Sequence, residues 1–229
     1  AFRTIVSERC VDSWKSQWQI QLDRRLIART DRLLANSEPV AEFYRELGYP
    51  EKLISVLPNG VEIAQRDPEV RQKLLAEWNL PPEARVVGYV GRLAPQKRVR
   101  DLIWAFQLFR QLADKVYFVI AGDGPARDDL QEFAAQARCD HLMRFVGHRP
   151  EGAELMNAFD QFWLASDFEG MPNSLMEALA RGVPAIASDI SANRQLIEPG
   201  ETGALFPVGD SLALAQLADR LLSDSARAA

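Results

Sequence analysis

Two glutamates, Glu169 and Glu177, stand eight positions apart around the start of a predicted helix. The stretch DFEGMPNSLMEALARG (167–182) passes through a glycine and a proline before its helical pattern begins. Free N–H groups at a helix start can bind phosphate. A carboxylate one turn inside the helix can accept hydrogen bonds from both hydroxyls of a ribose, and one before the helix can accept them from a sugar. This order of groups indicates a nucleotide-sugar site.

Glu177 also has a structural interpretation. Ser174 and Glu177 fit a capping box, in which the glutamate reaches back to the first amides of the helix. Because that interpretation leaves Glu169 and Gly170 unexplained, both interpretations of Glu177 stay open.

Cations crowd a second loop, GRLAPQKRVR (91–100), just before another predicted helix. Cations at a helix start oppose the helix dipole, at a cost of about 0.3–1 kcal/mol each when exposed. Residues that weaken the local structure, such as these cations at the end of a strand, are typical of functional sites. We therefore predict that Arg92 and Lys97 bind an anionic ligand, and we interpret Arg98 and Arg100 as solvated surface charges.

Several other classes of site are excluded. Gly122 and Gly124 do not form a dinucleotide fingerprint, since Arg127 stands where the third glycine would be, and no G-x-x-x-x-G-K-[ST] phosphate loop exists. Cys10 and Cys139 have no metal-ligand spacing, and two histidines add no zinc pattern. The net charge of −5 argues against a nucleic-acid partner.

An alternation of strands and helices must position these loops. Strand-like runs fall at 84–91, 115–122, 142–147, 161–166, 183–188 and 203–208, and helical patterns at 99–112, 125–138, 151–158, 174–181, 191–197 and 210–223. Several strands are continuous apolar runs, as in sheets covered on both faces. The alternation predicts an α/β fold with a doubly wound parallel sheet, in which ligands bind at the carboxyl ends of the strands.

The first part of the chain has its own pattern. We predict a helix over 14–29, a strand over 31–37, a helix over 38–48, a strand over 53–61 and a helix over 68–79. Trp14, Trp18, Leu22 and Leu26 form one face of the first helix, which we assign to the core, with a membrane-surface role as the alternative. No apolar run reaches the ~18 residues of a membrane span. The start, AFRTIVSERC, lacks a signal-peptide pattern, and we expect a piece of a longer protein, cut at both ends.

Taken together and in order, the motifs resemble the carboxyl-terminal part of a retaining GT-B glycosyltransferase, from the large family that uses nucleotide-activated sugars. The matching stretches are VLPNGVE (56–62), GYVGRLAPQKR (88–98), VIAGDGP (119–125), RFVGHR (144–149), the E-x7-E pair, ALARGVPAIASDI (178–190) and ETGALFPVGD (201–210). One departure is Ser191-Ala192, where the family commonly has two glycines.

The resemblance implies a role for each motif residue. Arg92 and Lys97 would hold the donor diphosphate, and Ser174 and Leu175 would offer it backbone amides. Glu177 would bind the ribose. The other expected donor contacts are Gly91, the base loop with Val146, His148 and Arg149, and the sugar-facing segment with Glu169, Gly170, Met171, Pro172 and Asn173. For His148 an exposed loop position is an equal alternative to base stacking.

The resemblance also implies an architecture and a reaction. Residues 1–57 would be the tail of a Rossmann-like acceptor-side domain, 58–83 a hinge and linker beginning at Pro58-Asn59-Gly60, and 84–229 the Rossmann-like donor-binding domain. The reaction would retain anomeric configuration without a bound metal or other cofactor, from a UDP-, GDP- or ADP-sugar to a glycan or lipid-linked acceptor. We expect a cytoplasmic enzyme of polysaccharide biosynthesis, peripheral at the inner membrane face as an option, and a chain that is inactive without the rest of its N-terminal domain.

Two alternative functions come from other classes of protein. One is a domain that binds a nucleotide-sugar without transferring anything, and activity of the full-length parent separates the two. The other is a doubly wound signalling receiver, which needs an acidic cluster where this chain has Gly91-Arg92.

Overall fold

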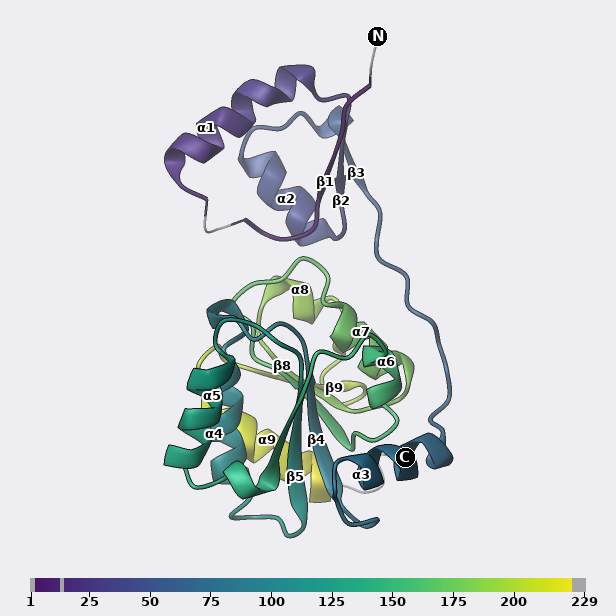
Figure 1. Cartoon of the computed structure of the whole chain (residues 1–229). Helices are drawn as coiled ribbons and strands as arrows, with labels where there is room; N and C mark the ends of the chain where they lie inside the picture. The colour runs from purple at the N-terminus through teal and green to yellow at the C-terminus, as the bar shows by residue number, and fades with distance from the viewer. Residues whose placement is uncertain (1–2, 13–14, 224–229) are drawn as a thin grey trace. The chain divides into compact units, whose positions relative to one another are not determined.

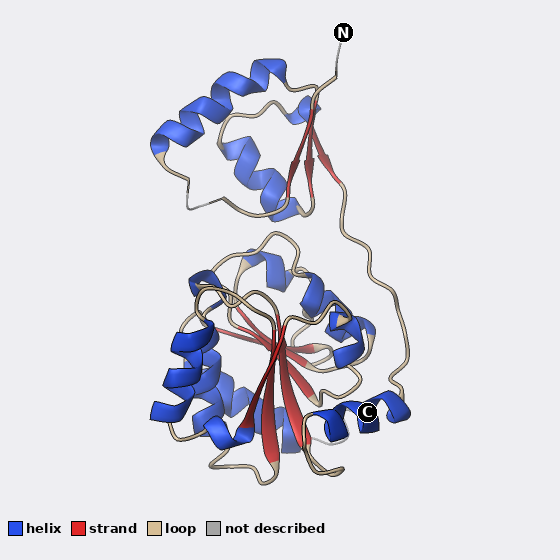
Figure 2. Ribbon diagram, viewed as in Figure 1, coloured by secondary structure: helices blue, strands red, loops and turns tan. Residues whose placement is uncertain are grey.

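The computed structural model describes residues 3–12 and 15–223, and the chain forms two compact units. Residues 1–60 together with 168–172 form the first unit, and residues 61–167 together with 173–229 form the second. Figures 1 and 2 show helices alternating with parallel strands in both units. No helix in the described ranges is both long and apolar enough to cross a membrane.

The first unit contains a three-stranded parallel sheet in the order β1-β2-β3. Its elements are β1 (Ile5–Glu8), α1 (Gln17–Leu26), β2 (Arg32–Ala35), α2 (Glu38–Glu46) and β3 (Ile54–Val56). Both helices lie on the same face of this sheet (Figure 1), as expected when right-handed crossovers advance in one direction. Leu33, Val40 and Tyr44 are fully buried in its core. The four later elements confirm the predicted pattern, whereas β1 was not predicted.

The helix α1 departs from the sequence prediction. It has no buried residue, and Trp18, Leu22 and Leu26 are 66%, 46% and 47% exposed, so their assignment to the core is wrong. A polar contact ties α1 to the end of α2 instead, because Arg24 Nε donates to the Leu47 carbonyl at 2.8 Å. Periodicity identified an apolar face but not whether another element covers it. Trp14 lies outside the described residues.

The second unit is built on six parallel strands in the order β6-β5-β4-β7-β8-β9. The strands are β4 (Arg85–Val90), β5 (Val116–Ala121), β6 (Met143–Gly147), β7 (Gln161–Leu164), β8 (Ala185–Ser188) and β9 (Gly203–Phe206). The helices are α3 (Pro68–Glu77), α4 (Val99–Phe109), α5 (Arg127–Gln136), α6 (Gly152–Leu155), α7 (Asn173–Ala180), α8 (Ser191–Arg194) and α9 (Ser211–Ser223). Figure 1 shows α4, α5 and α9 on one face of the sheet and α6 and α7 on the other. The predicted α/β, doubly wound parallel sheet is confirmed.

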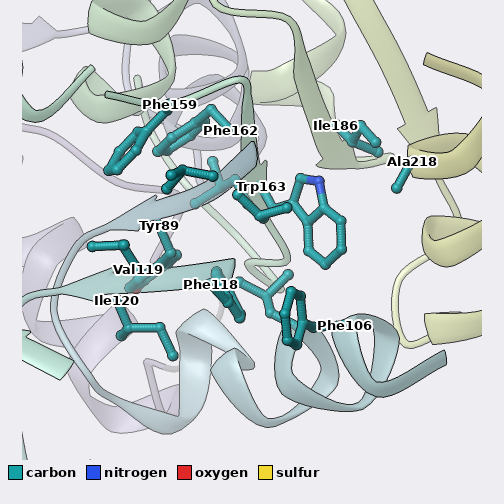
Figure 3. Packing of buried hydrophobic residues seen from close by; sticks show 14 of the residues in the cluster. Tyr89, Phe106, Phe118, Val119, Ile120, Phe159, Phe162, Trp163, Ile186 and Ala218 are labelled. Atoms are coloured by element: carbon teal, nitrogen blue, oxygen red, sulfur yellow. The ribbon is translucent and has the colours of Figure 1, made fainter. Parts of the chain in front are cut away.

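The core of this sheet is aromatic (Figure 3). Phe118 lies between Phe106 and Trp163, with ring centroids 5.4 Å and 5.7 Å away. Gly88 of β4 leaves room for the ring of Phe159, since a Cβ there would come within 2.1 Å of that ring. This packing fixes β4, β5 and β7 against each other, and these are the strands that carry the candidate site.

The predicted linker, residues 58–83, contains α3, which packs on the second unit. Asp67 caps α3 by accepting a hydrogen bond from the Glu69 amide at 2.8 Å. Arg71 donates to the Ala158 carbonyl at 2.6 Å and pairs with Asp160 at 3.1 Å. The helix is therefore part of the second unit's framework.

Candidate functional site

The strand order places two loops at the topological switch point of the six-stranded sheet. The chain runs from β4 outward through β5 to β6 and then returns to β7 on the other side of β4. Ligands of doubly wound sheets bind outside the carboxyl ends of the strands at such a point. The loop after β4 carries Arg92 and Lys97, and the segment after β7 leads to α7.

The turns after β4, β5 and β6 meet closely beside this point. The Gly91 amide donates to the Ala121 carbonyl at 3.0 Å, and the Gly122 amide donates to the Gly147 carbonyl at 2.7 Å. A Cβ on Gly122 would lie 1.8 Å from the Gly91 oxygen, so only glycine allows this approach.

A pocket of about 420 Å³ opens where these turns meet. It is lined by Val90, Gly91, Arg92, Ala121, Gly122, Asp123, His148 and Arg149. The structure thus brings together four predicted donor-site residues from two loops more than fifty positions apart in sequence: Gly91, Arg92, His148 and Arg149.

Arg92 contributes a positive charge to this pocket that is not paired with any residue that the structure describes. Its side chain is exposed, and its guanidinium makes no hydrogen bond or ion pair with any residue that the structure describes. Its backbone is fixed, because the Tyr89 hydroxyl donates to the Arg92 carbonyl at 3.0 Å. The loop is therefore preorganised without using the cation.

The rest of the cationic loop is tied to the segment after β7. The Asp167 amide donates to the Gln96 carbonyl at 2.9 Å, which holds the 3₁₀ turn Pro95–Lys97 in place. Arg98 Nε lies 2.6 Å from Asp101 Oδ2, and its Nη1 lies 3.1 Å from Asp167 Oδ1. The interpretation of Arg98 as a solvated charge is wrong, since two carboxylates bind it and relieve its position at the start of α4.

Arg100 stays on the surface but has a partner too. Its guanidinium carbon lies 3.9 Å from the centre of the Phe133 ring, in a cation–π contact. Neither Arg98 nor Arg100 lines the pocket.

The helix α7 begins at Asn173, which decides the capping question for Glu177. Ser174 and Leu175 lie in the first turn, where amides have no acceptor within the helix. Since Ser174 is inside the helix, it is not the N-cap. The Glu177 side chain makes no hydrogen bond with any described residue, so the capping-box interpretation is wrong. Burial raises the pKa of the half-buried Glu177 carboxyl, and the nearby charge of Arg181 partly opposes this.

The base loop has one contact that the sequence did not predict. His148 is exposed at the pocket, whereas the Arg149 guanidinium pairs with Glu77 at the end of α3. Seventy-two positions separate Glu77 from Arg149, and Glu77 lies within an ordinary polar helical pattern. No local signal in the sequence could have identified it.

The segment 168–172 belongs to the first unit. Glu169 is 8% exposed, and Gly170 forms an isolated bridge with Cys10 in that unit. Met171 is half-buried and Pro172 is buried. The predicted donor-site residues are therefore divided between the units, with Glu169 to Pro172 in one and the pocket and α7 in the other.

The Ser191-Ala192 departure causes no backbone strain. Neither residue has a positive φ, so the turn before α8 does not require glycine. The described residues contain no group of three or more His, Cys, Asp or Glu side chains that could hold a metal ion.

Comparisons with known proteins agree with this arrangement. Residues 70–229 match the family described as "Glycosyl transferases group 1", and residues 8–65 match "Glycosyltransferase Family 4". A GDP-mannose-dependent alpha-mannosyltransferase of Mycobacterium tuberculosis (strain CDC 1551 / Oshkosh) is 34% identical over 189 residues, which are 82% of this chain and 47% of that protein. The UDP-Gal:alpha-D-GlcNAc-diphosphoundecaprenol alpha-1,3-galactosyltransferase of Escherichia coli is 32% identical over 171 residues, or 72% of this chain and 44% of that protein. The chain spans about half the length of these curated relatives.

Solved structures show the same fold. Anabaena HepE, in a complex with UDP and glucose, superposes with a TM-score of 0.90 at 23% identity, covering 99% of this chain and 63% of HepE. Sucrose-phosphate synthase from Thermosynechococcus elongatus superposes with a TM-score of 0.81 at 23% identity, covering 93% of this chain and 54% of that one. Both likenesses support the fold alone.

Proposed function

The chain belongs to the glycosyl transferases group 1 family, and from that membership we propose that it is the donor-binding part of an enzyme that transfers a sugar from a nucleotide-sugar to an acceptor. The observation that carries this proposal is the uncommitted Arg92 guanidinium in a pocket at the switch point of the sheet. A cation held ready on a fixed backbone is what a leaving diphosphate requires.

Charge development explains why these residues suit the reaction. As the bond between sugar and phosphate breaks, negative charge grows on the leaving diphosphate, and preorganised donors lower the barrier by stabilising it. Arg92 and Lys97 would supply the positive charge, and the first-turn amides of Ser174 and Leu175 would add hydrogen bonds. These groups would act without a bound metal.

The two glutamates would hold the two ends of the donor. Glu177 lies four residues after the start of α7, and its carboxylate would accept hydrogen bonds from the ribose hydroxyls. Glu169, with the backbone of Gly170 to Asn173, would face the transferred sugar. Transfer would retain the anomeric configuration.

The donor base and the acceptor follow from the relatives only as proposals. The mycobacterial relative is named for GDP-mannose, and the Escherichia coli relative for UDP-Gal and an acceptor on diphosphoundecaprenol. We propose a UDP-, GDP- or ADP-sugar as donor and a glycan or lipid-linked acceptor, in a cytoplasmic enzyme that reaches the inner membrane face where the acceptor is a lipid.

A titration of the chain with UDP, GDP and ADP by calorimetry tests the proposal. One nucleoside diphosphate should bind more tightly than its nucleoside, and chelation of divalent metals with EDTA should leave that affinity unchanged. Failure of all three diphosphates to bind would refute a donor site. An affinity that disappears with EDTA would refute the metal-independent diphosphate site.

A further inference from the structure

The two arginines that line the pocket differ in their ion pairing. Arg92 has no partner among the described residues, whereas Arg149 is engaged from two sides. Its guanidinium pairs with Glu77, and its Nε donates to the Val146 carbonyl at 3.4 Å. Arg149 is therefore neutralised and oriented before any ligand arrives.

Glu77 is held in place by its neighbour in the chain. Trp78 is only 4% exposed, and its ring stacks on Phe159 with centroids 6.3 Å apart. Arg144 Nε donates to the Trp78 carbonyl at 2.9 Å, which ties the end of α3 to β6. Exposed ion pairs are weak partly because ordering two long side chains costs entropy. Here the backbone on the carboxylate side is already fixed, so less of that cost remains.

A fixed and neutralised guanidinium suits a nucleotide base better than a phosphate. Guanidinium planes stack on aromatic faces, and a base is such a face. An Arg149 released from Glu77 would be a second free cation beside Arg92 and would attract the diphosphate to the wrong end of the pocket.

We infer that Glu77 is a positioning residue for the base of the donor nucleotide, acting through Arg149. This inference rests on the proposed function, because the base is that of the nucleotide-sugar. It also assigns a role in the donor pocket to α3, which lies in the segment expected to be a linker.

The test is Glu77→Gln, which keeps the side-chain volume and removes the charge. Calorimetry with a nucleoside should show binding weakened by about 3–5-fold, which is about 0.6–1 kcal/mol at room temperature. The diphosphate should lose less affinity, because the released Arg149 would also attract its phosphates. Glu77→Asp should recover part of the loss. Arg149→Ala should show a similar loss, and adding Glu77→Gln to it should cost nothing more.

Glu83→Gln is the matched control. Glu83 forms a comparable exposed ion pair with Lys115 at 3.0 Å but does not line this pocket, so its loss should leave both affinities unchanged. Wild-type affinities for Glu77→Gln, or an undiminished effect in the Arg149→Ala background, would overturn the inference while leaving the donor site intact. A wild-type chain that binds no nucleotide would overturn both.

Discussion

Replacing Arg92 with Ala should weaken diphosphate binding without destabilising the fold. The guanidinium makes no interaction with the described residues, and the Tyr89 hydroxyl holds the Arg92 backbone carbonyl, which alanine retains. Exposed substitutions of this kind usually change the free energy of unfolding by less than about 0.5 kcal/mol. The effect should therefore appear in ligand affinity alone.

The magnitude follows from the exposure of the site. A hydrogen bond to a charged group contributes about 1.5–3 kcal/mol. Two unit charges at about 4 Å attract by about 1 kcal/mol in water and about 4 kcal/mol near a protein surface. Because Arg92 is exposed, the lower part of these ranges applies, and we expect about 1.5 kcal/mol, or roughly a tenfold loss of affinity.

Calorimetry on the variant with a diphosphate and its matching nucleoside separates the two halves of the ligand. The diphosphate should bind about tenfold more weakly, and the nucleoside should bind as to the wild type. The difference should shrink as salt rises, because exposed charges are screened. Arg100→Ala is the control, since this cation lies over Phe133 and outside the pocket. Equal losses for nucleoside and diphosphate would refute the phosphate role of Arg92.

Three further substitutions test the site and the framework. Glu177→Gln should weaken nucleotide binding. Burial raises the pKa of Glu177, so the ionised carboxylate opposes folding at neutral pH. The variant should therefore be more stable than wild type in urea at neutral pH, and this difference should disappear below the ordinary glutamate pKa. Tyr44→Phe removes a buried hydroxyl that donates to Asp12 Oδ2 at 2.7 Å and should lower the free energy of unfolding by about 1.5–3 kcal/mol in urea titrations. Gly122→Ala places a Cβ 1.8 Å from the Gly91 oxygen at φ +141° and should reduce both thermal stability and nucleotide affinity.

Matched variants control for these effects. Tyr117→Phe loses a hydroxyl that makes no hydrogen bond with the described residues, so its stability should not change. Gly182→Ala has a φ of +66° with no atom within 4 Å, so it should lower stability through strain and spare nucleotide binding. A Glu177→Gln variant with wild-type affinity would exclude the ribose role. A Tyr44→Phe variant as stable as wild type would show that the hydroxyl bond contributes nothing, and normal binding by Gly122→Ala would refute the close approach of the two turns.

The sheet and the pocket could be predicted because their signals are local. Each strand of the second unit is a short apolar run, and the carboxyl ends of parallel strands meet at one edge. Residues just after those runs, such as Arg92 and Arg149, were therefore expected along the same edge of the sheet. The order of the strands needed the structure, and it decides both where the switch point lies and which of these residues share a pocket.

Features that depend on a neighbour distant in sequence could not be predicted. The apolar stripe of α1 was assigned to the core because periodicity shows a face and not what covers it. The sequence flagged Arg98 as a cation at a helix start, but its pairing with Asp167 joins loops from two strands. The contact of Glu77 with Arg149 depends on how α3 packs against β6.

Ion pairing decides which cations in and beside the pocket keep a free charge. Arg98 is bound by two carboxylates and Arg149 by one, so neither presents a free charge to a ligand. Arg92 remains uncommitted on a fixed backbone. A ligand with a charged end and an aromatic end would therefore bind in one orientation. Its anion would be attracted to Arg92, and its base could stack on Arg149, which would not compete for the phosphate. On the inference above, the carboxylate of Glu77 on α3 would help to orient the donor by holding Arg149.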